Sequence, residues 1–266
     1  MIHSLLMEYI YLALIGTSVG FVSSFFGIGG GSIMIPLLYI LFPKMPAQAI
    51  IATSLGTIFL NSGLNTYRYK AQLPPARIVL NMIIATSIGA YLGSKLIYSI
   101  PSEVVKKIFA FILIIATIRV FRSKKVDDNN LLKIHDFKVF QTAFGGALIS
   151  SLTGLGGGIL FVPMFMNIVK LPMRLISPYS NLAMTVATLM GLLPHFYKDI
   201  VYESELSLIN RTFIGHVNPI IILSLFVGAF LFSKIGVRYN NRVEDHTKKY
   251  LLCSLLIIFS LKILIF

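Results

Sequence analysis

Two glycine clusters with the same internal spacing are the residues of this chain best suited to chemistry. Gly27–Gly31 reads Gly-Ile-Gly-Gly-Gly and precedes Pro36, and Gly154–Gly158 reads Gly-Leu-Gly-Gly-Gly and precedes Pro163 at the same distance. Both clusters interrupt long apolar stretches, where glycine weakens a helix and exposes its backbone. A membrane protein that interrupts corresponding helices in its two halves commonly places its binding site at the interruptions.

The chemistry that such an interruption offers is the binding of a small anion. We expect half-helices to begin after the clusters, from Ser32 and Ile159, and to direct free N–H groups and a positive dipole end at the break. Ser32 and Thr153 add hydroxyl groups to the glycines. The predicted substrate-binding residues of the two clusters are Gly27, Gly29, Gly30, Gly31, Ser32, Thr153, Gly154, Gly156, Gly157 and Gly158.

A pair of polar segments recurs at the same offset as the glycines. Thr53-Ser54-Leu55 aligns with Ser180-Asn181-Leu182. We expect Thr53, Ser54, Ser180 and Asn181 to face the same cavity from the following helices and to complete the predicted site. Because Asn181 stands opposite Ser54, the two halves of the site need not be equivalent. The alternative interpretation of the glycines is close packing of helices through small residues, but the duplication favours a site.

The sequence does not support an enzyme or a cofactor. Neither cluster carries the Lys-Ser/Thr of a phosphate-binding loop or opens a Gly-x-Gly-x-x-Gly unit, and Ser32 and Ser151 lack the Gly-x-Ser-x-Gly context of a nucleophile. Cys253 is the single cysteine, which excludes a disulfide framework and a cysteine metal site. We therefore predict a protein that is not an enzyme and that holds no cofactor and no metal.

Ionisable groups are scarce in the long apolar segments. The acidic residues stand in loops or at segment ends, so the sequence predicts no carboxylate proton relay, although many ion-coupled transporters use one. His216 is the candidate membrane-embedded group for a proton or anion contact, and His195 stands near a segment end. The alternative for both histidines is a purely structural hydrogen bond.

The composition and the apolar segments predict an all-α integral membrane protein. Of 266 residues, 56% are hydrophobic and 12% are charged, whereas a soluble domain is about a quarter charged. The net charge of +13 comes from Lys and Arg in short loops, so we expect no nucleic-acid partner. With about 20 residues for each span, the predicted segments are 9–42 and 139–169, both interrupted by glycines, and 46–67, 78–100, 104–121, 177–197, 213–232 and 250–266. Residues 1–8 lack the features of a removable signal peptide.

The segments fall into two homologous halves. Residues 1–121 form an N-terminal transmembrane repeat, 122–138 a polar linker and 139–266 a C-terminal transmembrane repeat, because three sequence matches recur in the same order. The third match is between Gly89–Lys95 and Gly228–Lys234. Each half is predicted to contain a glycine-broken, re-entrant helix and three transmembrane helices.

The basic residues favour inverted repeats. If each broken segment is a hairpin, Arg68, Lys70, Arg77, the linker and the 234–249 region lie on one side of the membrane, which gives a positive-inside bias. Both termini are then outside. If each broken segment crosses once, the basic residues are balanced between the sides, and the halves are parallel repeats of four spans.

The paired glycine clusters, each followed by an apolar run to Pro36 or Pro163, resemble the TauE/SafE family of sulfite and organosulfonate permeases. Ala52–Leu55 and the loop 67–77, which leads into an Ile- and Gly-containing span, add to the likeness, and the resemblance covers essentially the whole chain. It implies a protein of the prokaryotic cytoplasmic membrane that moves sulfite, sulfonates or related small sulfur-containing anions.

The function predicted from these observations is a secondary transporter of a small sulfur-containing anion that works by alternating access. The implied partners are the anion and the lipid bilayer, and a proton is a candidate coupling ion. The alternative is an anion channel in which the glycines line a filter. The sequence leaves open the substrate, the direction of transport, the coupling ion and the oligomeric state.

Overall fold

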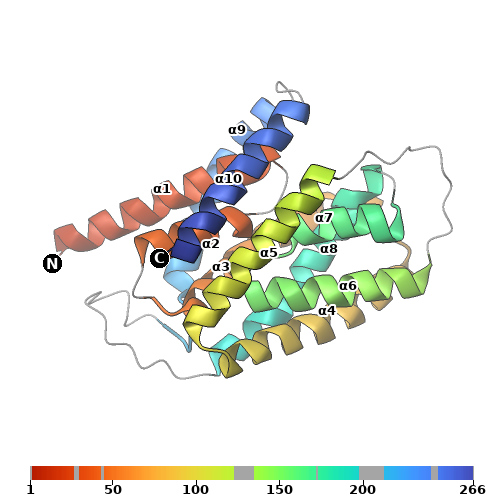
Figure 1. Cartoon of the computed structure of the whole chain (residues 1–266), viewed down its shortest axis with the longest axis horizontal. Coiled ribbons are helices and arrows are strands. Elements are labelled where there is room, and N and C mark those ends of the chain that lie inside the picture. The colour runs from red at the N-terminus through yellow and green to blue at the C-terminus, as the bar shows by residue number, and fades with distance from the viewer. Residues whose placement is uncertain are drawn as a thin grey trace.

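The protein is built from helices. The computed structural model describes residues 2–26, 30–42, 45–122, 135–171, 173–197, 213–240 and 245–265. In these ranges every regular element is a helix, apart from one isolated bridge between Ile214 and Val217. The all-helical prediction is therefore confirmed (Figure 1).

The described part of the first half contains five α-helices, and the predicted interruption separates the first two. The helices are α1 (Ile2–Phe26), α2 (Gly31–Leu41), α3 (Ala47–Arg68), α4 (Ala76–Leu96) and α5 (Ser102–Arg122). The 3₁₀ turns η1 (Lys70–Gln72) and η2 (Ile97–Ser99) follow α3 and α4. Gly27 and Gly29 of the predicted site lie outside the described residues.

The second half repeats this order. It comprises α6 (Asp136–Thr153), α7 (Gly158–Met164), α8 (Met173–Leu192), α9 (Pro219–Asn240) and α10 (Asp245–Ile265). A π-helical turn, η3 (Phe165–Val169), continues α7, and the 3₁₀ turn η4 (Leu193–Phe196) continues α8. Most of the predicted linker, residues 123–134, lies outside the described residues.

One predicted segment begins too early. The sequence predicts a span over 213–232, but α9 begins at Pro219 and runs to Asn240. Asn218 ends the preceding irregular stretch, since its Oδ1 accepts hydrogen bonds from the backbone N–H groups of Ile220 (3.0 Å) and Ile221 (3.1 Å). Asparagine before a first-turn proline is a strong helix-start signal. Consequently His216 lies in the connection before α9 and not within a helix.

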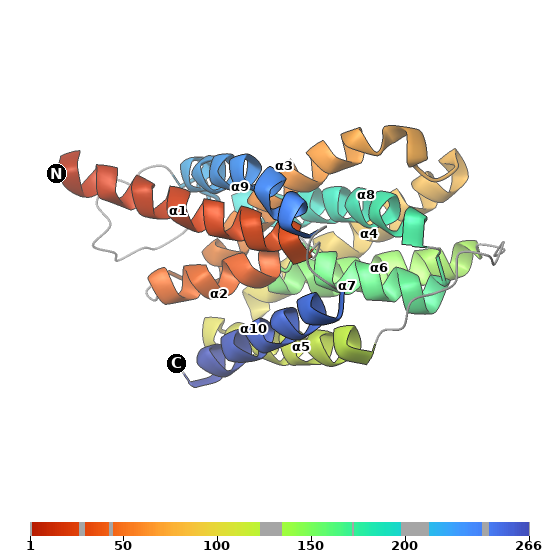
Figure 2. The ribbon, with the colours of Figure 1, turned by 90° about the horizontal axis from the view of Figure 1, so that it is seen from above.

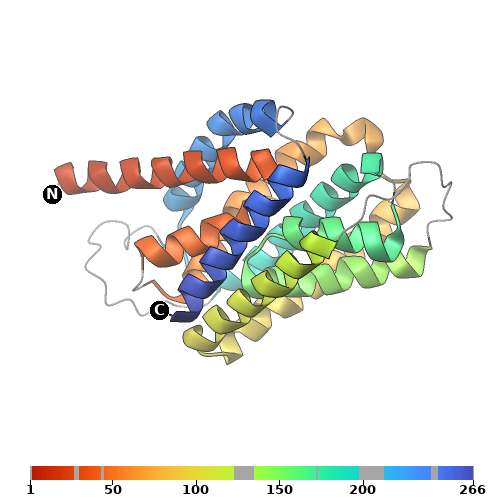
Figure 3. The same cartoon turned by 45° about the horizontal axis from the view of Figure 1, so that its top comes forward.

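The two halves interlock, and their contacts follow a symmetric pattern. α1 packs along α9, and its counterpart α6 packs along α4, which is the counterpart of α9. α3 pairs with its own counterpart α8, and α5 pairs with α10. Figures 1 and 3 show α5 beside α10 and α4 beside α6. Exchanging the halves therefore turns each of these pairs into itself or into another of them, although other contacts, such as that of α6 with α8, are not repeated to the same extent.

Glycines allow the closest of these helix pairs to touch through their backbones. An added Cβ at Gly20 of α1 would lie 2.3 Å from the carbonyl oxygen of Ala229 in α9. In the counterpart of this pair, formed by α4 and α6, a Cβ added at Gly93 of α4 would lie 2.3 Å from the carbonyl oxygen of Leu148 in α6. Small residues let apolar helices approach this closely.

The helix ends define two ends of the molecule. α1 begins and α10 ends at the same end, on the left in Figure 2. The connection between α3 and α4 lies at the opposite end, where α5 also ends and α6 begins. In both halves the short helix after the break folds back beside the helix before it, α2 beside α1 and α7 beside α6 (Figures 1 and 3).

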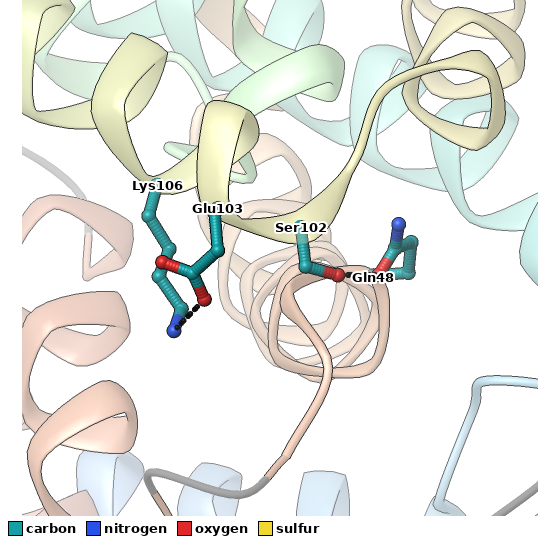
Figure 4. A network of polar contacts seen from close by, with 4 residues as sticks. All are labelled: Gln48, Ser102, Glu103 and Lys106. Carbon is teal, nitrogen blue, oxygen red and sulfur yellow. Dashed lines mark hydrogen bonds and ion pairs between the residues drawn. The ribbon is translucent and has the colours of Figure 1, made fainter.

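A polar contact fixes the start of α5 on the start of α3 (Figure 4). The Ser102 hydroxyl donates to Oε1 of Gln48 at 2.8 Å, and Lys106 pairs with Glu103 at 2.9 Å one turn along α5. Glu103 in the first turn also suits the positive end of the helix dipole. The contact holds α5, which follows the α3–α4 hairpin, against the first helix of that hairpin.

Two helices are long and apolar enough to cross a membrane by length and composition. Among the described residues these are Ala47–Arg68 and Ala76–Ser99. The other apolar stretches are shorter, and they include Ile10–Val22, Gly31–Ile40 and Gly158–Val169. Short apolar helices on both sides of a break are what a broken span produces.

Candidate functional site

The two glycine breaks meet in the interior of the protein. An added Cβ at Gly31, the first residue of α2, would lie 2.4 Å from the carbonyl oxygen of Leu155 and 2.8 Å from that of Gly154. Gly31 therefore lies directly against the backbone of the second cluster, although the two clusters are more than a hundred positions apart in the sequence. The structure thus brings together the described parts of both predicted clusters.

The second break needs glycine for its backbone conformation. Gly154, Gly156 and Gly157 have φ angles of 72°, 67° and 88°, in the left-handed region that L-residues rarely adopt. Gly30 stands at the position that corresponds to Gly157, yet it has φ −70° and ψ −20°. Equal sequence therefore does not give equal backbone geometry in the two breaks.

Side chains of the first half surround the second break. A Cβ at Gly154 would lie 2.9 Å from Cδ1 of Ile35 in α2 and 3.0 Å from Cγ1 of Ile51 in α3. A Cβ at Gly156 would lie 2.2 Å from Cδ1 of Ile58, also in α3. The second break is consequently packed into the first half of the chain.

Ser54 and its counterpart Asn181 have different partners. The Ser54 hydroxyl donates to the carbonyl oxygen of Gly154 at 2.7 Å and ties α3 to the second break. The Asn181 side chain donates to the carbonyl oxygen of Ser177 in its own helix at 2.8 Å. Among the predicted residues the structure joins Ser54 with Gly31 and Gly154, whereas the hydrogen bonds of Asn181 with Ser177 and Thr185 stay within α8.

Several buried hydroxyl groups of the predicted site have no hydrogen-bond partner among the described residues. Ser32 and Thr53 are fully buried and Ser180 is 1% exposed. Buried helical hydroxyls usually donate to a carbonyl oxygen of the preceding turn, as Thr153 does to Ile149 at 2.7 Å. Because buried polar groups are generally satisfied, the unpartnered hydroxyls are available donors.

Backbone N–H groups add to these donors. The N–H groups of Gly31 and Ser32 open α2, and those of Gly158 and Ile159 open α7, so none has a carbonyl partner one turn earlier in its own helix. Among bonds between described residues, the first bonded N–H groups are those of Ile33 and Leu160, which donate to the carbonyls of Gly30 and Gly157. Neutral O–H and N–H donors of this kind suit an anion's oxygen atoms.

Ser150 is a residue of this region that the sequence prediction omitted. It is fully buried, its Oγ has no partner among the described residues, and it lies 3.3 Å from the position of a Cβ on Gly157. A signal was present in the sequence: Ser150-Ser151 precedes Gly154 by the same spacing as Ser23-Ser24 precedes Gly27.

His216 lies in a separate cluster. The Tyr98 hydroxyl and Nδ1 of His195 share a hydrogen bond of 2.7 Å. The rings of Tyr98 and His216 stack with their centroids 5.3 Å apart, and the backbone N–H of His216 donates to the backbone carbonyl of His195 at 2.8 Å. These residues belong to η2, η4 and the connection before α9, outside the long helices. Tyr98 packs against the hydrophobic core that contains Leu155 of the second break.

Both histidines of this cluster are neutral near pH 7. Burial lowers the pKa of His195 to about 3, with a smaller effect from His216, and burial lowers the pKa of His216 to about 4. The described residues also form no group of three or more His, Cys, Asp or Glu side chains able to hold a metal ion.

Comparison with known proteins identifies the family. Residues 12–263 match the family described as sulfite exporter TauE/SafE. The chain belongs to the TauE/SafE family. The predicted resemblance is therefore confirmed over nearly the whole chain.

Curated relatives of this TauE/SafE protein carry the name probable membrane transporter protein. One from Haemophilus influenzae is 30% identical over 74% of this chain and 75% of its own length. A relative from Methanocaldococcus jannaschii is 26% identical over 92% of this chain and 91% of its own length. A relative from Bacillus subtilis is 24% identical over 91% of this chain and 92% of its own length. The family and its relatives indicate a membrane protein of a transporter class.

Proposed function

We propose that this TauE/SafE protein is a secondary transporter of a small sulfur-containing anion, such as sulfite or an organosulfonate, in a prokaryotic cytoplasmic membrane. The observation that carries the proposal is the contact of Gly31 with the backbone of Gly154 and Leu155. This contact gives both halves of the chain a shared surface at their breaks, where a substrate can be held between them.

The donors at the breaks support an anion as the substrate. The hydroxyls of Ser32, Thr53, Ser150 and Ser180 are buried without partners among the described residues, and the first N–H groups of α2 and α7 have no acceptor in the described part of their helices. Glu103 and Asp136, the acidic residues with described side chains, stand in the first turns of α5 and α6. Donors without competing carboxylates favour a negative ligand, and the family description supplies sulfite as the first anion to test.

The proposed mechanism is alternating access by an inverted pair of repeats. The helix pairing that survives exchange of the halves supports it, as do the hairpins α1–α2 and α6–α7. The start of α1 and the end of α10 lie at one end, and Arg68, Lys70 and Arg77 lie in or beside the α3–α4 connection at the other. By the positive-inside rule the basic end faces the cytoplasm and both termini lie outside.

Uptake by proteoliposomes tests the proposal. Purified protein is reconstituted, and uptake of sulfite, thiosulfate, sulfate, sulfoacetate and a carboxylate control is measured with and without a pH gradient. We expect saturable uptake of one or more sulfur anions that is stimulated by the same anion on the opposite side. Absence of such uptake for every sulfur anion refutes the proposal. Single-channel currents in a planar bilayer would show that the protein is an anion channel and not a carrier.

The pH gradient in this experiment tests the proton as coupling ion. His195 and His216 form the buried titratable pair outside the breaks, and both are neutral at the pH of the assay. If a pH gradient changes the rate of anion uptake in the wild-type protein but not in His216→Gln, proton coupling is assigned to this histidine cluster.

A further inference from the structure

A groove opens on the surface between the end of α1 and the start of α10 (Figure 3). Its volume is about 430 Å³, which is in the range of small-molecule sites. α1 packs along α9 and α10 packs along α5, so each wall of the groove is held from its far side. The apolar side chains of the walls include Phe21, Val22 and Phe25 of α1 and Leu251, Leu255 and Ile258 of α10. We call this feature the α1–α10 groove.

The walls of the α1–α10 groove suit an apolar chain. Ser254 contributes a hydroxyl to the lining, and this hydroxyl already donates to the carbonyl oxygen of Leu251 in its own helix at 2.9 Å. Ile258 is 62% exposed and Leu251 is 49% exposed, so the groove is open along α10. A hydrocarbon chain can therefore cover these walls without leaving a polar group of the lining unsatisfied.

Tyrosines stand at one end of the groove, where α9 ends and α10 begins. The rings of Phe21 and Tyr239 pack edge to face with their centroids 6.1 Å apart, and those of Phe121 and Tyr250 do so at 5.8 Å. Both tyrosines are 48% exposed. Because tyrosine is enriched at the level of the lipid headgroups, we place this end of the groove at the membrane interface.

Positive charge gathers near the same end. Arg238 directly precedes Tyr239 in α9, and Arg119 stands two residues before Phe121 in α5, and both arginines are exposed. The sequence from 238 to 249 holds more basic than acidic residues: Arg238, Arg242, Lys248 and Lys249 against Glu244 and Asp245. Clusters of Arg and Lys beside membrane helices attract the headgroups of anionic phospholipids.

We propose that the α1–α10 groove binds an acyl chain of an anionic phospholipid, whose phosphate lies beside Arg238 and Arg119. The apolar walls account for the chain, and the arginines account for the charge of the headgroup. The bound lipid bridges α1 and α10, which otherwise pack mainly on different helices. Since a ligand that binds only the folded state stabilises it, the lipid is expected to stabilise the folded protein. This inference goes beyond the proposed transport function and does not depend on the transported substrate.

Thermal unfolding of the full chain in detergent tests the site. The probes are phosphatidylglycerol and phosphatidylcholine with the same acyl chains, and glycerol 3-phosphate, which has no acyl chain. We expect phosphatidylglycerol to raise the melting temperature and to bind about tenfold or more tightly than phosphatidylcholine. Glycerol 3-phosphate should give no shift. Equal affinities for the two phospholipids, or an equal shift with glycerol 3-phosphate, refute the proposal.

Two variants separate the groove from the headgroup contact. Ile258→Trp puts a larger ring into the groove and should weaken the binding of phosphatidylglycerol about tenfold or more. Leu80→Trp is the matched control, because Leu80 in α4 is 60% exposed but does not line the groove. Arg238→Gln should bring the affinity for phosphatidylglycerol closer to that for phosphatidylcholine, and it decides the matter if Ile258→Trp fails to fold.

Two results with these variants would overturn the lipid site. One is a loss of binding in Leu80→Trp as large as that in Ile258→Trp. The other is a wild-type dimer in detergent that Ile258→Trp dissociates, because a second copy of the chain would then cover the groove. None of these measurements involves transport, so their failure and the failure of the proposed function are distinguishable.

Discussion

Replacing Gly31 by alanine is the most direct perturbation of the contact between the breaks. The new Cβ would lie 2.4 Å from the Leu155 carbonyl oxygen, 2.6 Å from its carbon and 2.8 Å from the Gly154 oxygen. Ordinary contacts begin at 3.4 Å, so α2 and the second break must separate by about 1 Å, which sacrifices much of the attraction across the contact. The obstacle is backbone, which cannot rotate away as a side chain can.

The expected cost follows from this geometry. Overpacking costs about 1–3 kcal/mol, and displacement of Gly154 also stretches the Ser54 hydrogen bond, worth about 1 kcal/mol. Each kcal/mol of lost stability lowers the melting temperature by about 2–4 °C in proteins of about 150–250 residues. The melting temperature in detergent should therefore fall by several degrees. Because the displaced groups form the proposed site, sulfite uptake per folded molecule should fall about tenfold or more, the effect of losing one hydrogen bond to a charged group.

Two alanine variants make this measurement decisive. Gly89→Ala creates a similar clash, 2.4 Å from the Phe144 carbonyl oxygen, but at the contact of α4 with α6. Gly145→Ala meets no atom within 4 Å and should be neutral or slightly stabilising. Gly89→Ala should lose stability but keep its uptake per folded molecule. Equal uptake per folded molecule in Gly31→Ala and Gly89→Ala refutes a special role for the contact between the breaks.

Three further outcomes are expected. Gly157→Ala should lose about 1–2 kcal/mol of stability from left-handed strain, whereas Gly30→Ala lacks this cost because Gly30 has φ −70°; equal melting temperatures would contradict the difference. Asn218→Ala should lower the free energy of unfolding by about 0.5–2 kcal/mol, because it removes the side-chain cap at the start of α9. Asn218→Ser should keep most of this stability in a denaturation assay. Because burial lowers the pKa of His195 to about 3, the unfolded chain binds the proton first, so stability should fall as pH drops below about 6.5. His195→Gln should flatten that dependence, and an unchanged slope would contradict the assignment.

The helices and their interruptions could be predicted from the sequence because both depend on local chemistry. Long apolar segments indicate helices, and a cluster of several glycines, such as Gly154–Gly158, disfavours a continuous helix because its residues lack Cβ atoms. α6 ends at Thr153 and α7 begins at Gly158, at the predicted break, and α2 begins at Gly31. The start of α9 was predicted too early, since the apolar pattern from Phe213 outweighed the Asn218-Pro219 start signal.

The pairing of helices could not be predicted in the same way. The sequence indicates two equivalent halves, but it does not say that α1 packs along α9 or that α6 packs along α4. These contacts depend on the closeness that Gly20 and Gly93 permit with a partner far along the chain. A glycine in an apolar helix shows that close approach is allowed, and not which helix approaches.

The sequence by itself determined the duplicated clusters, the family likeness and the residue types suited to an anion, because these are properties of composition and spacing. Only the tertiary structure decided that Gly31 rests on Gly154 and Leu155, that Ser54 bonds the second break while Asn181 bonds its own helix, and that His216 contacts Tyr98. Whether a buried hydroxyl is free or bonded depends on which backbone lies opposite it, and that neighbour comes from the other half of the chain.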